Sequence, residues 1–357
     1  MTVQPQDWII PGAGLVAWNM DDRIKTVLRT LIRNFIDSAE PVGSRTLSRL
    51  LDIDLSPATI RNIMADLTEY GFLEQPYPSA GRIPTEKSYR FFLDTCELDM
   101  ELSEKTREGI EQRLMKKKGG LNHMLEEATR IISNETTFTG LVSSPRLSEA
   151  RMRRVDFLRI DESRVYVVLI TISNMIHNRI IEVSEELSQD FLDQVSGVLN
   201  EQFSGSLLSE VRSRMVESLM KDKDAYEEML AQAVRVGKKA LDLTEERELY
   251  VDGHFHMVEG FSGMDSIRKL LMALEEKMTI IELLDQTLTT PGLRVRISPS
   301  LANMALQECS VVASTYGGKD RALGTIGIMG PLRMDYQRVI PVVDYTARML
   351  TEMICNQ

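Results

Sequence analysis

Apolar residues recur at helical spacing through much of the first hundred residues. From Asp22 to Ile36 they return every three or four positions, which predicts an amphipathic helix. A short second helix is expected over residues 45–51, with Ser44 as its cap. Residues 72–85 then carry three prolines and one glycine between short apolar pieces, a composition typical of a β-hairpin.

Between these elements lies a third helix whose two ends are both marked. Ser56 suits the N-cap, Pro57 suits the first turn, and Gly71 can close the last turn in a left-handed conformation. Its inward stripe repeats at helical spacing and consists of Ile60, Ile63, Met64 and Leu67. The first turn is therefore expected to present polar side chains to the outside.

The order helix, short helix, turn, capped helix and hairpin predicts a winged helix-turn-helix. In that geometry the first turn of the last helix faces base edges in a major groove, so Thr59, Arg61 and Asn62 would read bases. The hairpin tip carries small residues that allow close approach to a minor groove, where Arg82 supplies charge. Taken alone, the capped helix would be interpreted as an ordinary surface helix, so the order of elements carries the inference. The residues expected to contact DNA are Arg45, Thr46, Ser56, Thr59, Arg61, Asn62, Ser79, Gly81 and Arg82.

Strand candidates rich in Val and Ile flank a mainly helical block at residues 189–243. They lie at residues 153–161, 164–172, 177–185, 293–298, 309–317 and 322–331. One α/β domain interrupted by an inserted module explains this order, because the two sets of strands could then share one sheet. Two separate small domains are the alternative. A closing helix is expected from its inward stripe of Val339, Val343, Ala347 and Leu350.

Composition and charge narrow the class of protein. Of the 357 residues, 43% are hydrophobic and 27% are charged, as in ordinary globular domains, and no apolar run is long enough to span a membrane. The net charge is -11, yet residues 21–95 hold ten basic against eleven acidic side chains, so a DNA-binding face would have to be local. Three widely spaced cysteines disfavour a disulfide framework and indicate a reducing cytoplasm. The first residues lack a basic segment, which disfavours a signal peptide.

Motifs for catalysis or ligand binding are weak. The glycine-rich residues 316–331 lack the Gly-Lys-Ser/Thr ending of a P-loop and are interpreted as turns and close-packed strands. His254 and His256 alternate on an expected strand and could share a face, but no third metal ligand lies at a useful spacing. No nucleophile signature is present either. We therefore expect no enzyme activity, no cofactor and no metal.

Several long segments resemble one family. “EPVGSRTLSRL”, “LSPATIRNIMADLTEYGFLEQP” and “SAGRIPTEKSYRFFLD” near the start, with “ECSVVASTYG” and “LGTIGIMGPLRMDYQRVIPVVDYTARML” near the end, are similar to the heat-inducible transcription repressors called HrcA. The resemblance covers residues 21–357. Tyr77 and Pro78 stand where the family usually has His and Thr, so wing shape and operator preference are where this chain would differ. The first 19 residues have no counterpart in the pattern, and Met20 fits a translation start.

The resemblance implies an α+β multidomain protein. A winged helix-turn-helix at residues 21–98 would be followed by a GAF-like α/β domain at residues 99–200 and 276–357. A mainly helical dimerisation insert at residues 201–275 would interrupt the GAF-like domain, and residues 1–20 would be an extension outside the family.

The resemblance also implies a function. Proteins of this kind are dimeric repressors of the groE and dnaK heat-shock operons, bind the CIRCE inverted repeat, and depend on the GroE chaperonin for their active fold. The expected partners are thus double-stranded DNA, a second copy of the chain and GroE, with no membrane, in the cytoplasm at the nucleoid. The alternative is a small-molecule-responsive winged-helix repressor that uses the GAF-like domain as its sensor.

Overall fold

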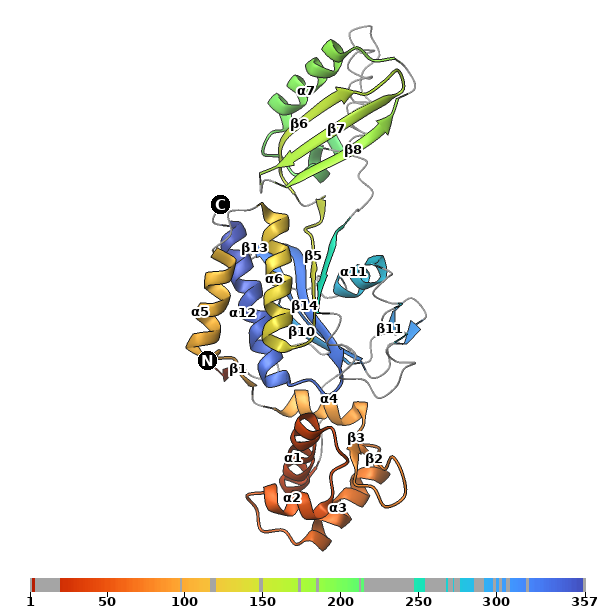
Figure 1. Ribbon diagram of the computed structural model, residues 1–357, viewed down its shortest axis with the longest axis vertical. Coiled ribbons are helices and arrows are strands. Elements are labelled where there is room, and N and C mark those ends of the chain that lie inside the picture. Colours follow the sequence, from red (N-terminus) through yellow and green to blue (C-terminus); the bar gives the residue numbers. More distant parts are fainter. Residues whose placement is uncertain are drawn as a thin grey trace.

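The structure, a computed structural model, arranges the chain in three groups along its longest axis (Figure 1). It describes residues 2–3, 20–96, 98–115, 120–147, 150–172, 175–183, 186–211, 213–214, 247–253, 268, 272, 277–285, 292–297, 300–301, 304–305, 309–318 and 321–355. Most of the N-terminal extension, most of the expected 201–275 insert, and both His254 and His256 lie outside these residues. Within the described part of the chain, no helix is long and apolar enough to cross a membrane.

The first group is the winged helix-turn-helix, and its elements follow the predicted order. They are α1 (Asp22–Ser38), α2 (Ser44–Leu50), α3 (Pro57–Glu69), β2 (Leu73–Glu74), β3 (Ile83–Pro84) and α4 (Glu86–Thr95). Leu28, Leu47 and Ile60, one from each of the first three helices, are fully buried in the shared core. The expected cap of the second helix is wrong by one residue, because Gly43 occupies the N-cap position and Ser44 is the first helical residue.

The second group is a five-stranded antiparallel sheet in the order β10-β13-β14-β5-β9. Its strands are β5 (Thr139–Ser143), β9 (Leu249–Asp252), β10 (Leu293–Ile297), β13 (Cys309–Gly318) and β14 (Arg321–Pro331). One face packs against α6 (Leu121–Thr136) and α12 (Tyr336–Cys355), with α5 (Glu104–Met115) outside them, and the other packs against α11 (Lys277–Asp285). The predicted stripe of the closing helix is confirmed, since Val339, Val343, Ala347 and Leu350 are all buried. Two short antiparallel pairs complete the list, namely β1 (Thr2–Val3) with β4 (Leu98–Asp99) and β11 (Ser300–Leu301) with β12 (Met304–Ala305).

The third group is a separate sheet with its own core. Strands β6 (Met152–Arg159), β7 (Arg164–Thr171) and β8 (Ile176–Glu182) pair in sequence order, and α7 (Gln189–Phe203) covers one face. The three strands were expected, but they do not share a sheet with the C-terminal strands. The sheet that spans the interruption uses β5, which the sequence analysis did not identify, and β9. The inserted unit therefore begins after Ser143 and includes β6–β8, so the expected boundary at residues 200 and 201 does not coincide with the sheets.

The outer edge of β6 is covered by side chains of α7. Asn200 of α7 accepts a hydrogen bond from the backbone N–H of Val155 at 2.7 Å and donates one to the carbonyl of Val155 at 2.9 Å. Gln189 repeats this exchange with the N–H of Arg159 and the carbonyl of Phe157, each at 2.9 Å. Side-chain amides thus satisfy backbone groups that would otherwise accept another strand.

Buried Arg247 joins the two chain segments that cross between the central sheet and the inserted unit. Its guanidinium donates to the Ser143 hydroxyl at 2.9 Å and to the Ser144 carbonyl at 3.2 Å. The backbone N–H of Ser144 donates to the carbonyl of Glu248 at 2.8 Å, and the Ser144 hydroxyl accepts from the Glu248 N–H at 2.9 Å. These bonds fix the points where the chain leaves the central sheet and returns to it.

Candidate nucleic-acid interface

The first turn of α3 is held by its own cap. The Ser56 hydroxyl accepts a hydrogen bond from the backbone N–H of Thr59 at 3.1 Å and lies 2.9 Å from the Thr59 hydroxyl. Pro57 occupies the start of the helix, as predicted. Because Ile60 and Met64 are buried on the inner face, the rotation of α3 about its axis is fixed. The polar residues of the first turns, Ser56, Thr59, Arg61 and Asn62, are consequently exposed.

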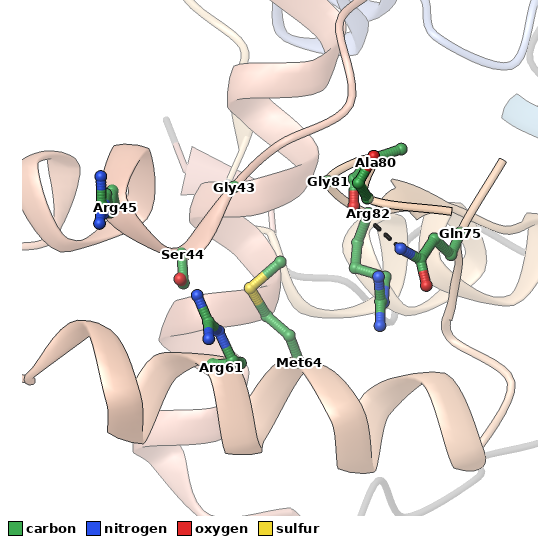
Figure 2. A pocket seen from close by; sticks show the side chains of 10 residues that line it. Gly43, Ser44, Arg45, Arg61, Met64, Gln75, Ala80, Gly81 and Arg82 are labelled. Atoms are coloured by element: carbon green, nitrogen blue, oxygen red, sulfur yellow. Dashed lines mark hydrogen bonds between the residues drawn. The ribbon is translucent and has the colours of Figure 1, made fainter. Parts of the chain in front are cut away.

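A groove of about 420 Å³ runs between α3, the start of α2 and the wing. Arg61 comes from α3, Arg45 from α2 and Arg82 from the wing, so each of three elements brings one arginine to the groove (Figure 2). No carboxylate lines it, and none of the three arginines forms an ion pair with a described residue. The complete lining is Gly43, Ser44, Arg45, Arg61, Met64, Gln75, Ser79, Ala80, Gly81 and Arg82. In a chain with a net charge of -11, this is a local cationic surface of the kind that attracts phosphate.

The base of the wing is tied to the loop between α1 and α2. Val42 and Arg82 exchange two backbone hydrogen bonds of 2.9 Å, which adds a third strand segment beside the β2–β3 pair. Gly81 makes this approach possible, because a Cβ there would lie 2.5 Å from the Val42 carbonyl oxygen and 2.6 Å from the Pro41 carbonyl carbon. The reason for glycine at this position is therefore close backbone packing at the wing base.

Arg82 was expected at the tip of the wing, but its side chain lies against α3. Instead of projecting from the wing tip, its side chain turns toward α3, and its Nε donates to the Thr68 hydroxyl at 3.0 Å. The tip itself is a turn in which the Ala80 N–H donates to the Tyr77 carbonyl at 3.1 Å, with Ser79 in a left-handed conformation at φ 71°. The contact of Arg82 with α3 forms only when the wing folds back on the helix, and the residues around Arg82 in the sequence carry no signal for that.

The structure also places other residues at or beside this surface. Arg45 and Thr46 are exposed on α2, as a DNA contact requires, and Gln75 lines the groove with its Nε2 donating to the Ala80 carbonyl at 3.2 Å. Gln75 and Thr68 were not identified from the sequence. The only signal for Thr68 is its place on α3, two turns after Arg61.

The remaining candidates for chemistry lie elsewhere and have structural explanations. The glycines of β14 are close-packed, as expected, since a Cβ on Gly327 would lie 2.8 Å from the Val312 carbonyl oxygen. Cys96 and Cys309 are buried free thiols, and burial raises the pKa of the Cys309 thiol to about 12. Among the described residues there is no group of three or more side chains that could hold a metal ion.

Two family profiles match this chain. The family profile described as “Winged helix-turn-helix transcription repressor, HrcA DNA-binding” matches residues 19–96, and that described as “HrcA protein C terminal domain” matches residues 122–340.

Full-length relatives and one solved structure extend the likeness. A “Heat-inducible transcription repressor HrcA” of Geobacter sulfurreducens is 34% identical over 338 residues, which are 94% of this chain and 98% of that protein. One of Xylella fastidiosa is 35% identical over 334 residues, 93% of this chain and 95% of that protein. A solved structure described as “a hypothetical protein at 2.2 A resolution” shares the fold, with a TM-score of 0.61 at 22% identity over 95% of this chain and 99% of its own.

Proposed function

Because this chain belongs to the HrcA family of heat-inducible transcription repressors, we propose that it binds the CIRCE inverted repeat of the groE and dnaK operons as a homodimer. The observation that carries the proposal is the groove lined by Arg45, Arg61 and Arg82 beside the exposed first turn of α3. A helix-turn-helix sets that turn against base edges, and cations beside it neutralise phosphates.

The expected contact residues other than Arg82 take three roles in this proposal. Thr59, Arg61 and Asn62 read bases, since Arg pairs with guanine and Asn with adenine through two hydrogen bonds. Arg45, which lines the groove, and the exposed Thr46 and Ser56, which do not line it, contact phosphates. Ser79 at the tip brings the wing backbone close to the duplex, and Gly81 contributes by holding the wing base against the α1–α2 loop.

An inverted repeat is matched by a twofold dimer, which the inserted unit supports. On the face of the β6–β8 sheet that α7 does not cover, Leu158, Tyr166 and Ile180 form one row across the three strands. Leu158 is 50% exposed, Ile180 is 52% exposed and Ile176 is 61% exposed. Apolar side chains gathered on one face are typical of surfaces that a partner covers, so we propose that a second copy covers this one. In this proposal the dimerising unit includes β6–β8 and is not confined to residues 201–275.

The proposed control by GroE rests on family membership. A regulator that needs the chaperonin to reach its competent fold would lose activity when heat-unfolded proteins occupy GroE. Folded domains are stable by only about 5–15 kcal/mol, so a modest loss of assistance changes the competent fraction. Such a repressor works in the cytoplasm, at the nucleoid.

The test is a fluorescence anisotropy titration at fixed salt. The chain is titrated against a CIRCE duplex and a scrambled duplex of the same composition, with and without GroE. We expect tighter binding to the intact repeat, a stoichiometry of two chains per duplex, and a larger active fraction with GroE. Equal weak binding of both duplexes by a folded dimer would contradict the operator assignment.

A second candidate function is a repressor that responds to an anionic small molecule, and one observation favours it. Arg294 on β10 is only 6% exposed, its Nε has no hydrogen-bond partner, and no described carboxylate forms an ion pair with it. Arg296 lies on the same face, where burial and the charge of Arg294 lower its pKa. A buried cation beside a half-buried one on the same face favours an anion near both. If thermal unfolding and operator affinity do not respond to inorganic phosphate or dicarboxylates at constant ionic strength, this candidate is wrong.

A further inference from the structure

The groove between α3 and the wing contains a guanidinium whose direction is set by a neighbouring hydroxyl. Thr68 donates its single hydroxyl proton to the Met64 carbonyl one turn earlier in α3, at 2.7 Å. With that proton committed, the Thr68 oxygen can only accept, and it accepts from the Nε of Arg82 at 3.0 Å. The hydroxyl therefore acts as an oriented acceptor for the arginine of the wing.

This bond engages the Nε of the Arg82 guanidinium, and no described residue accepts a hydrogen bond from its two terminal nitrogens. Arg82 lines the groove together with Arg61, which rises from α3 on the other side (Figure 2). With no carboxylate in the lining, the groove offers donors to an anion and no competing acid. Arginine nitrogens in this arrangement match the oxygens of a phosphate, which accept two parallel hydrogen bonds.

The backbone holds the same arrangement from the other side. Arg82 is fixed to Val42 by two hydrogen bonds, and Gly81 permits that contact. The Cα of Arg82 is thus set by the wing base and its guanidinium by α3. An arginine anchored in this way is directed toward α3, so it is poorly placed to enter a minor groove.

We propose that Arg82 binds a phosphate of the DNA backbone in this groove, and that Thr68 is the positioning residue that aims it. The inference rests on DNA binding by the winged helix and deepens it. Arg82 then contributes affinity that does not depend on DNA sequence. Thr68 does not touch DNA, but it strengthens the phosphate contact by holding the Arg82 guanidinium in place.

The first experiment measures the affinity of Arg82→Ala for the CIRCE duplex and for the scrambled duplex as a function of salt. A phosphate contact predicts a loss of about tenfold on both duplexes and a slope of log K against log salt that is shallower by about 0.9. A minor-groove contact would instead change the ratio between the two duplexes, and that result would overturn the assignment.

The second experiment tests Thr68 with a matched pair of variants. Thr68→Val keeps the shape of the side chain but removes the acceptor, whereas Thr68→Ser keeps the hydroxyl. We expect Thr68→Val to weaken binding to both duplexes about threefold to tenfold, the effect of one lost hydrogen bond, with the salt slope unchanged because the charge remains. Thr68→Ser, which keeps the hydroxyl, should bind both duplexes with wild-type affinity. Wild-type affinity in Thr68→Val, or an equal loss of affinity in Thr68→Ser and Thr68→Val, would overturn the positioning role.

Two controls separate the possible failures. Thermal unfolding of each variant reports folding, and addition of Arg82→Ala to Thr68→Val should cause no loss beyond that of Arg82→Ala alone, because the two residues act through one contact. If the wild-type chain does not prefer CIRCE to the scrambled duplex, the operator proposal fails while the phosphate contact is still measured on both duplexes. If the preference holds and the variants behave otherwise than described, only the inference fails.

Discussion

Replacing Gly81 by alanine would place a methyl group inside the contact between the wing and the α1–α2 loop. The added carbon would lie 2.5 Å from the Val42 carbonyl oxygen and 2.6 Å from the Pro41 carbonyl carbon. Both neighbours are backbone atoms, which cannot move aside as the end of a flexible side chain can. The wing must therefore separate from the loop.

The cost follows from what the separation breaks. Inserting a methyl group into a packed contact costs about 1–3 kcal/mol, and each of the two hydrogen bonds between Val42 and Arg82 contributes about 0.5–1.5 kcal/mol. Since relief of the clash and loss of the bonds are the same event, we expect a combined loss of about 2–4 kcal/mol. Arg82 would also move away from Thr68, so DNA binding would weaken with it.

Amide hydrogen exchange gives a direct assay. The N–H groups of Val42 and Arg82 are both bonded across this contact, and a loss of 2 kcal/mol or more should speed their exchange roughly 30-fold or more. Gly109→Ala is the matched control, because a Cβ at Gly109 in α5 meets no atom within 4 Å. That variant should be neutral or more stable by up to about 1 kcal/mol, as alanine is the better helix former, and should bind DNA as the wild type does.

One result would refute the reasoning. If Gly81→Ala left the exchange of both amides and the operator affinity at wild-type values, the wing would not depend on the Val42 contact. The positioning of Arg82 by the wing base would then be wrong as well.

Three further predictions concern α3 and the central sheet. Arg61→Ala should cost about 1–3 kcal/mol of operator binding and relax sequence preference in a titration against single-base variants, whereas a uniform loss would make Arg61 a phosphate contact. Ser56→Ala should lower the free energy of unfolding by about 1 kcal/mol in a urea titration, because the cap bond is lost. Ser56→Asp keeps a cap acceptor, so it should be as stable as the wild type but bind DNA less well. Equal stability of the wild type and both variants would contradict the cap. Burial raises the pKa of the Cys309 thiol from 9.0 to about 12, so the folded state favours the protonated thiol. The stability that comes from burying this neutral thiol is complete below pH 9.0 and is lost as the pH rises through 12. Mass spectrometry should accordingly find Cys309 unmodified by iodoacetamide at pH 8 until the chain unfolds, and rapid native labelling would contradict this burial.

The parts of the fold that local signals determine were predictable. Ser56, Pro57 and Gly71 act within a few residues of themselves, so α3 and its cap could be placed from the sequence. The same holds for the strands β6 to β8 and for the closing helix, whose apolar spacing is regular.

What escaped prediction depends on contacts between distant residues. The strand β5 is buried along its whole length and shows no alternation, so its five residues gave no clear signal. The closed edge of the small sheet depends on the amides of Gln189 and Asn200, which cap β6 from a helix 30 or more residues away. Arg82 was misplaced because its partner, Thr68, lies 14 residues earlier and meets it only after the wing has folded back.

The covered edge of β6 limits how many copies of the chain could join by pairing strands edge to edge. Within the described residues the small sheet ends at β6 on one side, where α7 occupies the backbone groups, and at β8 on the other. A unit with two open edges could add neighbours without end and grow into a fibre. A unit with one usable edge can join a single neighbour, and doing so consumes the edge of both. Edge pairing in this unit would therefore stop at two copies and could not grow into a fibre, whereas the proposed twofold dimer uses the exposed face of the same sheet.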